Sequence, residues 1–171
     1  MVMANIFLIG FMGTGKSTIA NSLKRKYDMQ VVDMDSEIEK NQGKAISEIF
    51  AEEGEEYFRD LETQLVMDLQ RRDNVVVSCG GGAVLREKNV QEMRKSGKII
   101  LLQATPETIL ERVKNSHNRP LLEGNKNIDF IKELMSKRED KYNSAADIVV
   151  SVDARAVEDI ADEVYSKVFS K

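Results

Sequence analysis

The chain has 171 residues, 42% of them hydrophobic and 32% charged, which predicts one domain over residues 1–171 with a substantial buried core. Its net charge of −4 argues against a nucleic-acid or anionic-membrane partner, and its one cysteine, Cys79, excludes a disulfide framework and a cysteine-rich metal site. No apolar run could span a bilayer and no signal-peptide pattern precedes the first strand, so we expect a cytoplasmic protein. No exposed apolar helix face stands out, and we therefore expect a monomer.

Short, apolar, β-branched runs alternate with helical patterns along the chain. Buried strands separated by helices predict an α/β fold in which helices cover both faces of a parallel sheet. Thr105 and Pro106 suit the start of a helix over residues 106–115, because threonine caps helices and proline fits the first helical position. The strands are expected at residues 6–9, 31–32, 75–77, 99–102 and 148–152.

A phosphate-binding loop is predicted at residues 10–17, which read Gly-Phe-Met-Gly-Thr-Gly-Lys-Ser between the first strand and a helical pattern over residues 17–27. Glycines let successive N–H groups turn toward phosphate oxygens, and the start of the helix adds a partial positive charge. Lys16 can bridge the terminal phosphates, and the Ser17 hydroxyl can bind Mg²⁺. The alternative is a glycine-rich turn that matches by chance, and the complete pattern in this context argues against it.

The second strand ends in Asp33-Met34-Asp35. Ligands of open α/β sheets bind outside the carboxyl ends of the strands, so both carboxylates are expected near the nucleotide. One could bind Mg²⁺ through water, and the other could orient an acceptor hydroxyl or take its proton. The alternative is that Asp35 merely caps a helix over residues 36–41.

Residues 54–62 open a helix that is expected to continue to Arg71. Arg59 lies within helical reach of Glu55 and Glu62, which leaves two interpretations. The arginine could form a solvated salt bridge worth about a few tenths of a kcal/mol. The glutamates could instead orient the arginine so that it clamps a carboxylate with two hydrogen bonds.

Three consecutive glycines, Gly80, Gly81 and Gly82, follow the third strand. A simple turn needs one glycine, so the surplus indicates that a ligand approaches the backbone and meets its N–H groups. Further on, Arg138 lies four residues before Tyr142 on a helix expected over residues 128–142. Spacing alone favours a surface position for this arginine.

Residues 114–127 are rich in loop-forming residues and hold Arg119-Pro120 near their centre. One interpretation is a surface loop, with His117 as a surface residue. A lid that closes over a bound nucleotide would look the same. An arginine on such a lid could neutralise charge on the transferred phosphoryl group.

In this order, these elements resemble those of the shikimate kinase family over essentially the whole chain. The resemblance implies an α/β/α sandwich like that of nucleoside monophosphate kinases. It also implies a five-stranded parallel sheet in the order 2-3-1-4-5, a substrate-binding subdomain near residues 35–62 and a lid near residues 114–124. The resemblance rests on residues 10–17, Asp33-Met34-Asp35, residues 54–62, Cys79-Gly80-Gly81-Gly82, Arg119-Pro120-Leu121-Leu122, and the spacing from Arg138 through Tyr142 to Ala146-Asp147.

The same resemblance implies that a phosphoryl group passes from ATP to the 3-hydroxyl of shikimate, a step toward chorismate and the aromatic amino acids. It implies Mg²⁺ as a cofactor, held by Ser17 and Asp33. The residues implied in catalysis are Lys16, Asp35 and Arg119. Those implied in shikimate binding are Asp35, Arg59, Gly80, Gly81, Gly82 and Arg138, with both arginines on the carboxylate. Those implied at the nucleotide are Gly13, Thr14, Gly15, Lys16, Ser17, Thr18, Arg112, Arg119 and Arg155, with Arg112 and Arg155 bordering the adenine.

The chain departs from the family pattern at two positions. Val157 stands about where some relatives have a proline near the adenine. Cys79 stands where a small hydroxyl residue is often found, a change that we expect to be tolerated.

Three alternative functions fit the sequence less well. A phosphate-loop kinase for another small hydroxy acid, such as gluconate, would leave Arg59 and the three glycines unexplained. A guanine-reading switch should show Asn-Lys-x-Asp, whereas residues 125–128 read Asn-Lys-Asn-Ile. A catalytically dead binding module would tolerate the loss of Lys16, Asp35 or Arg119, and all three are present.

Overall fold

Five parallel strands form one sheet. The structure is a computed structural model that describes residues 4–113 and 127–170. The strands are β1 (Asn5–Ile9), β2 (Gln30–Asp33), β3 (Val75–Ser78), β4 (Gly97–Gln103) and β5 (Ile148–Ser151). Their order across the sheet is β2-β3-β1-β4-β5, which confirms the order that the family resemblance implied. All the residues of β1 are buried, because β1 is central and helices cover both faces.

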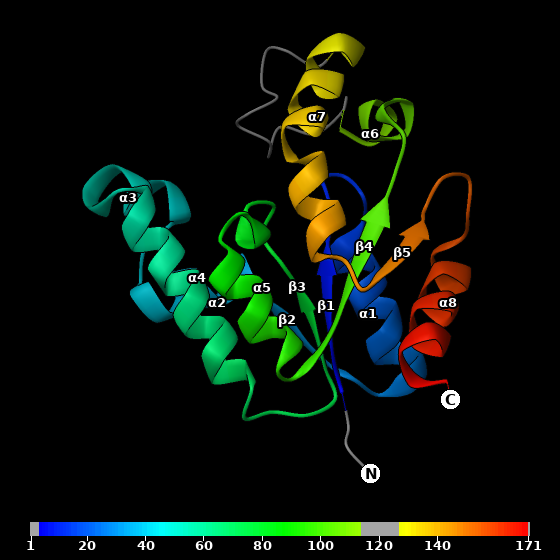
Figure 1. Cartoon of the computed structure of the whole chain (residues 1–171), viewed down its shortest axis with the longest axis horizontal. Coiled ribbons are helices and arrows are strands. Elements are labelled where there is room, and N and C mark those ends of the chain that lie inside the picture. Colours follow the sequence, from blue (N-terminus) through cyan, green and yellow to red (C-terminus); the bar gives the residue numbers. More distant parts are fainter. Residues whose placement is uncertain (1–3, 114–126, 171) are drawn as a thin grey trace.

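Helices on both faces of the sheet make three layers (Figure 1). On one face, α1 (Lys16–Tyr27) and α8 (Val157–Phe169) pack against each other. The other face carries α4 (Glu55–Leu69), α5 (Glu87–Arg94) and α7 (Ile128–Ala145). The shorter helices are α2 (Met34–Gln42), α3 (Ile46–Glu53), α6 (Pro106–Val113) and the 3₁₀ helix η1 (Ala83–Leu85). Within residues 4–113 and 127–170, no helix is both long and apolar enough to cross a membrane.

The register of the sheet gathers three loops at one edge. Ser78 at the end of β3 is aligned with Asp33 at the end of β2 and with Leu8 near the end of β1. Because the strands are parallel, the loops that follow them leave the sheet side by side. The phosphate-binding loop, the aspartates and the three glycines therefore meet at the same edge.

Local hydrogen bonds settle two questions about helix caps. The Asp33 side chain accepts a hydrogen bond from the Ser36 N–H at 3.1 Å, so Asp33 caps α2. The alternative that Asp35 caps this helix is therefore wrong, and Asp35 lies in the first turn. The Thr105 hydroxyl accepts from the Thr108 N–H at 3.3 Å, which confirms the predicted cap of α6. The predicted last two residues of that helix, 114 and 115, fall outside the described residues.

Candidate active site

A cavity of about 720 Å³ opens at the carboxyl edge of the sheet. Among the described residues to which the family resemblance gave a role in the site, Arg155 alone does not line it. Arg119 and the rest of the predicted lid, residues 114–124, lie outside the described residues. The predicted residues that line the cavity are Gly13, Thr14, Gly15, Lys16, Ser17, Thr18, Asp33, Asp35, Arg59, Gly80, Gly81, Gly82, Arg112 and Arg138.

The phosphate-binding loop wraps around one end of this cavity. Gly13 and Gly15 have φ angles of 85° and 93°, a left-handed conformation that residues with a Cβ rarely adopt. Gly15 is also the N-cap of α1, so the helix begins at the loop and directs its free N–H groups toward it. The Lys16 ammonium donates to the Gly10 carbonyl at 2.7 Å, which holds the charge over the loop. The arrangement is a concave, positively charged site for phosphate oxygens.

Three oxygen-bearing side chains meet beside the loop. The Ser17 hydroxyl donates to Asp33 Oδ2 at 3.2 Å and lies 3.2 Å from the Ser78 hydroxyl. Oxygen donors suit Mg²⁺, which commonly binds through one or two protein groups plus substrate phosphates. Ser17 and Asp33 beside a phosphate cradle therefore fit Mg²⁺. In the described part of the chain, no group of three or more His, Cys, Asp or Glu side chains could hold a metal.

Two carboxylates with raised pKa values lie on the other side of the cavity. Asp35 is exposed toward the cavity, and desolvation by the surrounding protein and the charge of Asp33 both raise its pKa. Glu62 is fully buried, and burial raises its pKa although the hydrogen bond from Arg59 opposes that shift. Both groups keep a proton to a higher pH than an ordinary carboxyl group does, and clustering of such groups in a cavity is typical of a functional site.

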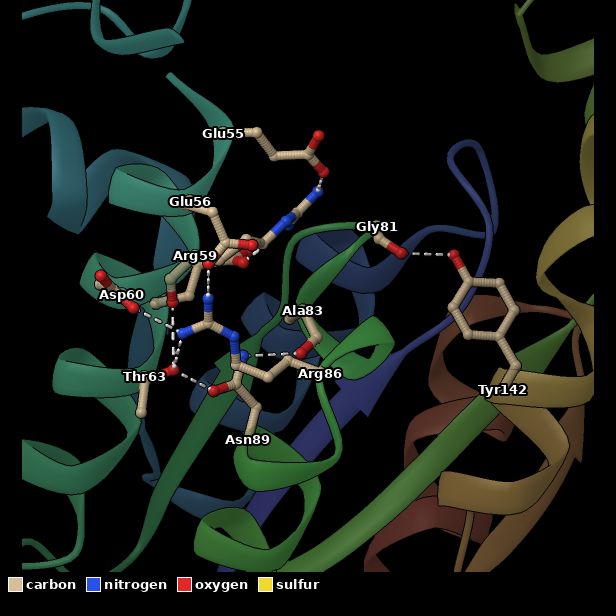
Figure 2. Close-up of polar contacts among 11 residues, drawn as sticks. Glu55, Glu56, Arg59, Asp60, Thr63, Gly81, Ala83, Arg86, Asn89 and Tyr142 are labelled. Carbon is tan, nitrogen blue, oxygen red and sulfur yellow. Dashed lines mark hydrogen bonds and ion pairs between the residues drawn. The ribbon is translucent and has the colours of Figure 1, made fainter. Parts of the chain in front are cut away.

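Arg59 is held in the cavity by the buried Glu62. One guanidinium nitrogen, Nη1, lies 2.7 Å from Glu62 Oε1, and the side chains of Arg59 and Glu62 are 14% and 1% exposed. A second carboxylate, that of the exposed Glu55, lies 3.5 Å from Nη2 (Figure 2). The guanidinium also lies 5.4 Å from the centre of the Phe58 ring. This is not a solvated surface pair, because the main partner is buried.

Each of the three glycines leaves room for a different side chain of the cavity. A Cβ at Gly80 would lie 2.9 Å from Asp35 Oδ1, and a Cβ at Gly81 would lie 2.9 Å from Arg138 Nη1. A Cβ at Gly82 would lie 2.5 Å from Arg59 Nη2. The surplus of glycines thus has a structural reason: the loop is the floor on which these polar groups converge.

A hydrogen-bond network behind this floor joins α4 to α5 (Figure 2). Arg86 donates to Asp60 at 2.7 Å and to Glu56 at 2.9 Å, both on α4. The buried amide of Asn89 donates to the Ala83 carbonyl at 2.8 Å and accepts from the Thr63 hydroxyl. The helix that carries Arg59 is therefore linked through Asn89 to the end of the glycine loop.

The two arginines expected near the adenine differ in their contacts. Arg112 reaches across to the phosphate loop and donates to the Gly13 carbonyl at 3.1 Å. Arg155 instead donates to the Ser151 carbonyl at 2.8 Å and pairs with Glu163 at 2.6 Å. Val157, which the family resemblance placed near the adenine, does line the cavity.

Sequence reasoning missed several residues that line the cavity. Ser78 carried a usable signal, since it ends β3 in register with Asp33. Ile46 carried none, because it comes from the start of α3, a helix that the sequence did not single out. The other missed lining residues are Ile19 and Ile160, whereas Met12 belongs to the predicted phosphate loop and Cys79 directly precedes the three glycines.

Comparison with known proteins agrees with this geometry. A statistical model of the family described as shikimate kinase matches residues 12–169. A shikimate kinase of Persephonella marina is 43% identical over 97% of this chain and 99% of its own length, and one of Caldanaerobacter subterraneus subsp. tengcongensis is 41% identical over 95% and 94%. The solved structure of the shikimate kinase from Acinetobacter baumannii in complex with shikimate has a TM-score of 0.86 and 31% identity, over 96% of this chain and 92% of that one. The chain belongs to the shikimate kinase family.

Proposed function

We propose that the protein transfers a phosphoryl group from ATP to the 3-hydroxyl of shikimate, giving ADP and shikimate 3-phosphate. The observation that carries this proposal is one cavity that joins a phosphate-binding loop to Asp35, Arg59 and Arg138. A phosphate cradle at one end suits ATP, which the family uses as a substrate. Two guanidinium groups at the other end suit an acceptor that is itself a carboxylate, as shikimate is.

At the acceptor end, Arg59 and Arg138 would bind the shikimate carboxylate. Arg59 is supported by the buried Glu62 and is therefore held in place before the substrate arrives. Asp35 and the backbone of residues 80–82 would bind the hydroxyl groups. Residues 35–62 would form the substrate-binding subdomain.

At the donor end, residues Gly13 to Thr18 would surround the phosphates of ATP, with Lys16 between the terminal ones. Arg112 is close enough to the loop to border the adenine. The same role for Arg155 requires its side chain to leave Glu163, so we propose it only as a contact formed on binding. Arg119 would act on the phosphates from the lid.

Ser17 and Asp33 would hold Mg²⁺, which when bound would neutralise phosphate charge. In the reaction, the 3-hydroxyl oxygen of shikimate bonds to the γ-phosphorus while the bond from that phosphorus to ADP breaks. Asp35 would orient the hydroxyl and accept its proton. Strong base catalysis is not required if the transition state is largely dissociative.

The raised pKa of Asp35 predicts how the reaction responds to acid. A raised pKa means that the carboxylate is protonated, and lost as an acceptor, at a higher pH than usual. The kcat/KM for shikimate should therefore fall as the pH is lowered, with a midpoint above the ordinary value of 3.8. Initial rates measured across the acid range should show this fall in kcat/KM in the wild type and in Glu62→Gln. If Asp35→Asn showed the same fall, the titrating group would be a residue other than Asp35.

Gly82→Ala tests whether the loop must lack a side chain. Gly82 has a φ of −102°, which alanine adopts without strain, so the effect should come from displacement of Arg59. We expect the shikimate KM to rise roughly tenfold or more, since misplacing a binding group is costly. Gly43→Ala is the matched control, because nothing lies within 4 Å of its Cβ. Its φ of 67° should lower stability and leave the shikimate KM unchanged.

The proposed function itself is tested by a coupled ADP-release assay with shikimate, quinate, gluconate and nucleoside monophosphates as acceptors. Shikimate should give the highest kcat/KM, and a preference for any other acceptor would overturn the proposal. Omitting Mg²⁺ should abolish turnover. The expectations of a monomer and of a cytoplasmic location remain predictions, which gel filtration and cell fractionation would check.

A further inference from the structure

Tyr142 reaches the glycine loop from the opposite side to Arg59 (Figure 2). It lies on α7, four residues after Arg138, so both side chains lie on the same side of that helix. Its hydroxyl donates to the Gly81 carbonyl at 2.7 Å, and the residue is only 6% exposed. The hydroxyl is thus a buried link between α7 and the floor of the acceptor pocket.

The same hydroxyl lies beside the Arg138 guanidinium, because the position of a Cβ on Gly81 is 3.8 Å from the Tyr142 hydroxyl and 2.9 Å from Arg138 Nη1. A phenol has one proton to donate and lone pairs that accept, so it can donate to the Gly81 carbonyl while it accepts from Arg138. The guanidinium then lies directly over the loop, where Nη1 is 2.9 Å from the position of a Cβ on Gly81. Burial raises the pKa of Tyr142, so the phenol keeps the proton that this arrangement needs.

We propose that Tyr142 is a positioning residue for acceptor binding: it holds the Arg138 guanidinium over Gly81 before the substrate arrives. This inference rests on the proposed function, in which Arg138 binds the shikimate carboxylate. Arginine loses much side-chain freedom when it is fixed, and a partner that fixes it in advance lowers the cost of binding. Tyr142 would fix the position of Arg138 in the same way that Glu62 fixes the position of Arg59.

The glycine loop is also held at its other end, so the hydrogen bond from Tyr142 acts on a loop that is already restrained. Asn89 donates to the Ala83 carbonyl at 2.8 Å, and Tyr142 acts two residues earlier, at Gly81. Because both carbonyls accept hydrogen bonds from side chains, the backbone from Gly81 to Ala83 has little freedom to move. The part of the loop that lies below the Arg138 guanidinium is therefore held by hydrogen bonds from both α5 and α7.

Tyr142→Phe removes the hydroxyl and keeps the ring. We expect the shikimate KM to rise about tenfold, because the Gly81 carbonyl loses its buried donor and the neighbouring Arg138 guanidinium loses a polar neighbour, with kcat and the ATP KM within about twofold of the wild type. Tyr27→Phe is the matched control, since it removes a hydroxyl that donates to Asp162 at 2.6 Å between α1 and α8. It should lower the melting temperature and leave the shikimate KM unchanged.

A double-mutant cycle separates positioning from a purely structural role. If Tyr142 acts through Arg138, Tyr142→Phe should add little to the shikimate KM once Arg138→Met is present. Full additivity, an unchanged KM in Tyr142→Phe, or an equal rise in the ATP KM would each overturn the inference. A direct titration with shikimate checks the KM values as affinities. If the wild type prefers another acceptor, the proposed function fails, and the same variants then test Tyr142 with that acceptor.

Discussion

Arg59→Ala is expected to raise the shikimate KM roughly a hundredfold or more, since truncating one member of a buried charge pair costs about 2–5 kcal/mol. Two losses combine in this variant. In the proposed complex, the substrate carboxylate loses a guanidinium. Glu62, whose side chain is 1% exposed, loses the partner at 2.7 Å that favours its ionised form. The pKa of Glu62, already raised by burial, should then rise further.

The measurement is the initial rate as a function of shikimate at saturating ATP. Arg59→Lys keeps the charge but not the two-pronged geometry, so it should restore the binding only in part. Arg72→Ala is the control for loss of one positive charge, because Arg72 is exposed, bonds Gln30 at 2.7 Å and does not line the cavity. An unchanged shikimate KM in Arg59→Ala would remove Arg59 from the carboxylate.

Lys16→Met is expected to lower kcat roughly 10²- to 10³-fold, the range found when a group that stabilises transition-state charge is removed. Methionine keeps most of the length of the side chain and loses its charge. The Lys16 ammonium already lies 2.7 Å from the Gly10 carbonyl, so ATP phosphates would exchange one oxygen partner for others. The negative charge on the γ-phosphoryl oxygens needs most stabilisation in the transition state, so loss of the ammonium should lower kcat more than it raises the ATP KM.

Lys26→Met provides the comparison for Lys16→Met. Lys26 lies near the end of the same helix, α1, and pairs with Asp162 at 2.7 Å, outside the cavity. The kcat of Lys26→Met should equal that of the wild type. If Lys16→Met kept kcat within tenfold of the wild type, Lys16 would have no major part in the transfer.

The sequence predicted best the parts of the site that follow directly from a strand. The phosphate loop, the Asp33–Asp35 pair and the three glycines each come immediately after a buried run, so topology alone places them at one edge. Local spacing also predicted that Arg59 could reach Glu62. It did not reveal that Glu62 is fully buried, which excludes a solvated surface pair.

Contacts between distant segments could not be predicted in the same way. The hydrogen bond from Thr63 to Asn89 joins residues 26 positions apart on two helices, and the bond from Tyr142 to Gly81 joins residues 61 apart. Arg155 shows the same limit, because its pairing with Glu163 depends on how the end of β5 faces α8. Such contacts depend on how whole helices and strands pack together, and they produce no periodic pattern in the sequence that could predict them.

The glycine loop bears on the design of inhibitors. A compound that hydrogen-bonds to peptide groups at Gly80, Gly81 and Gly82 would touch no side chain that a mutation could delete. A mutation could only add one, and the new Cβ would lie 2.9, 2.9 or 2.5 Å from Asp35, Arg138 or Arg59. If these three side chains bind the acceptor as proposed, a resistance mutation in the glycine loop would impair binding of the acceptor along with that of the drug.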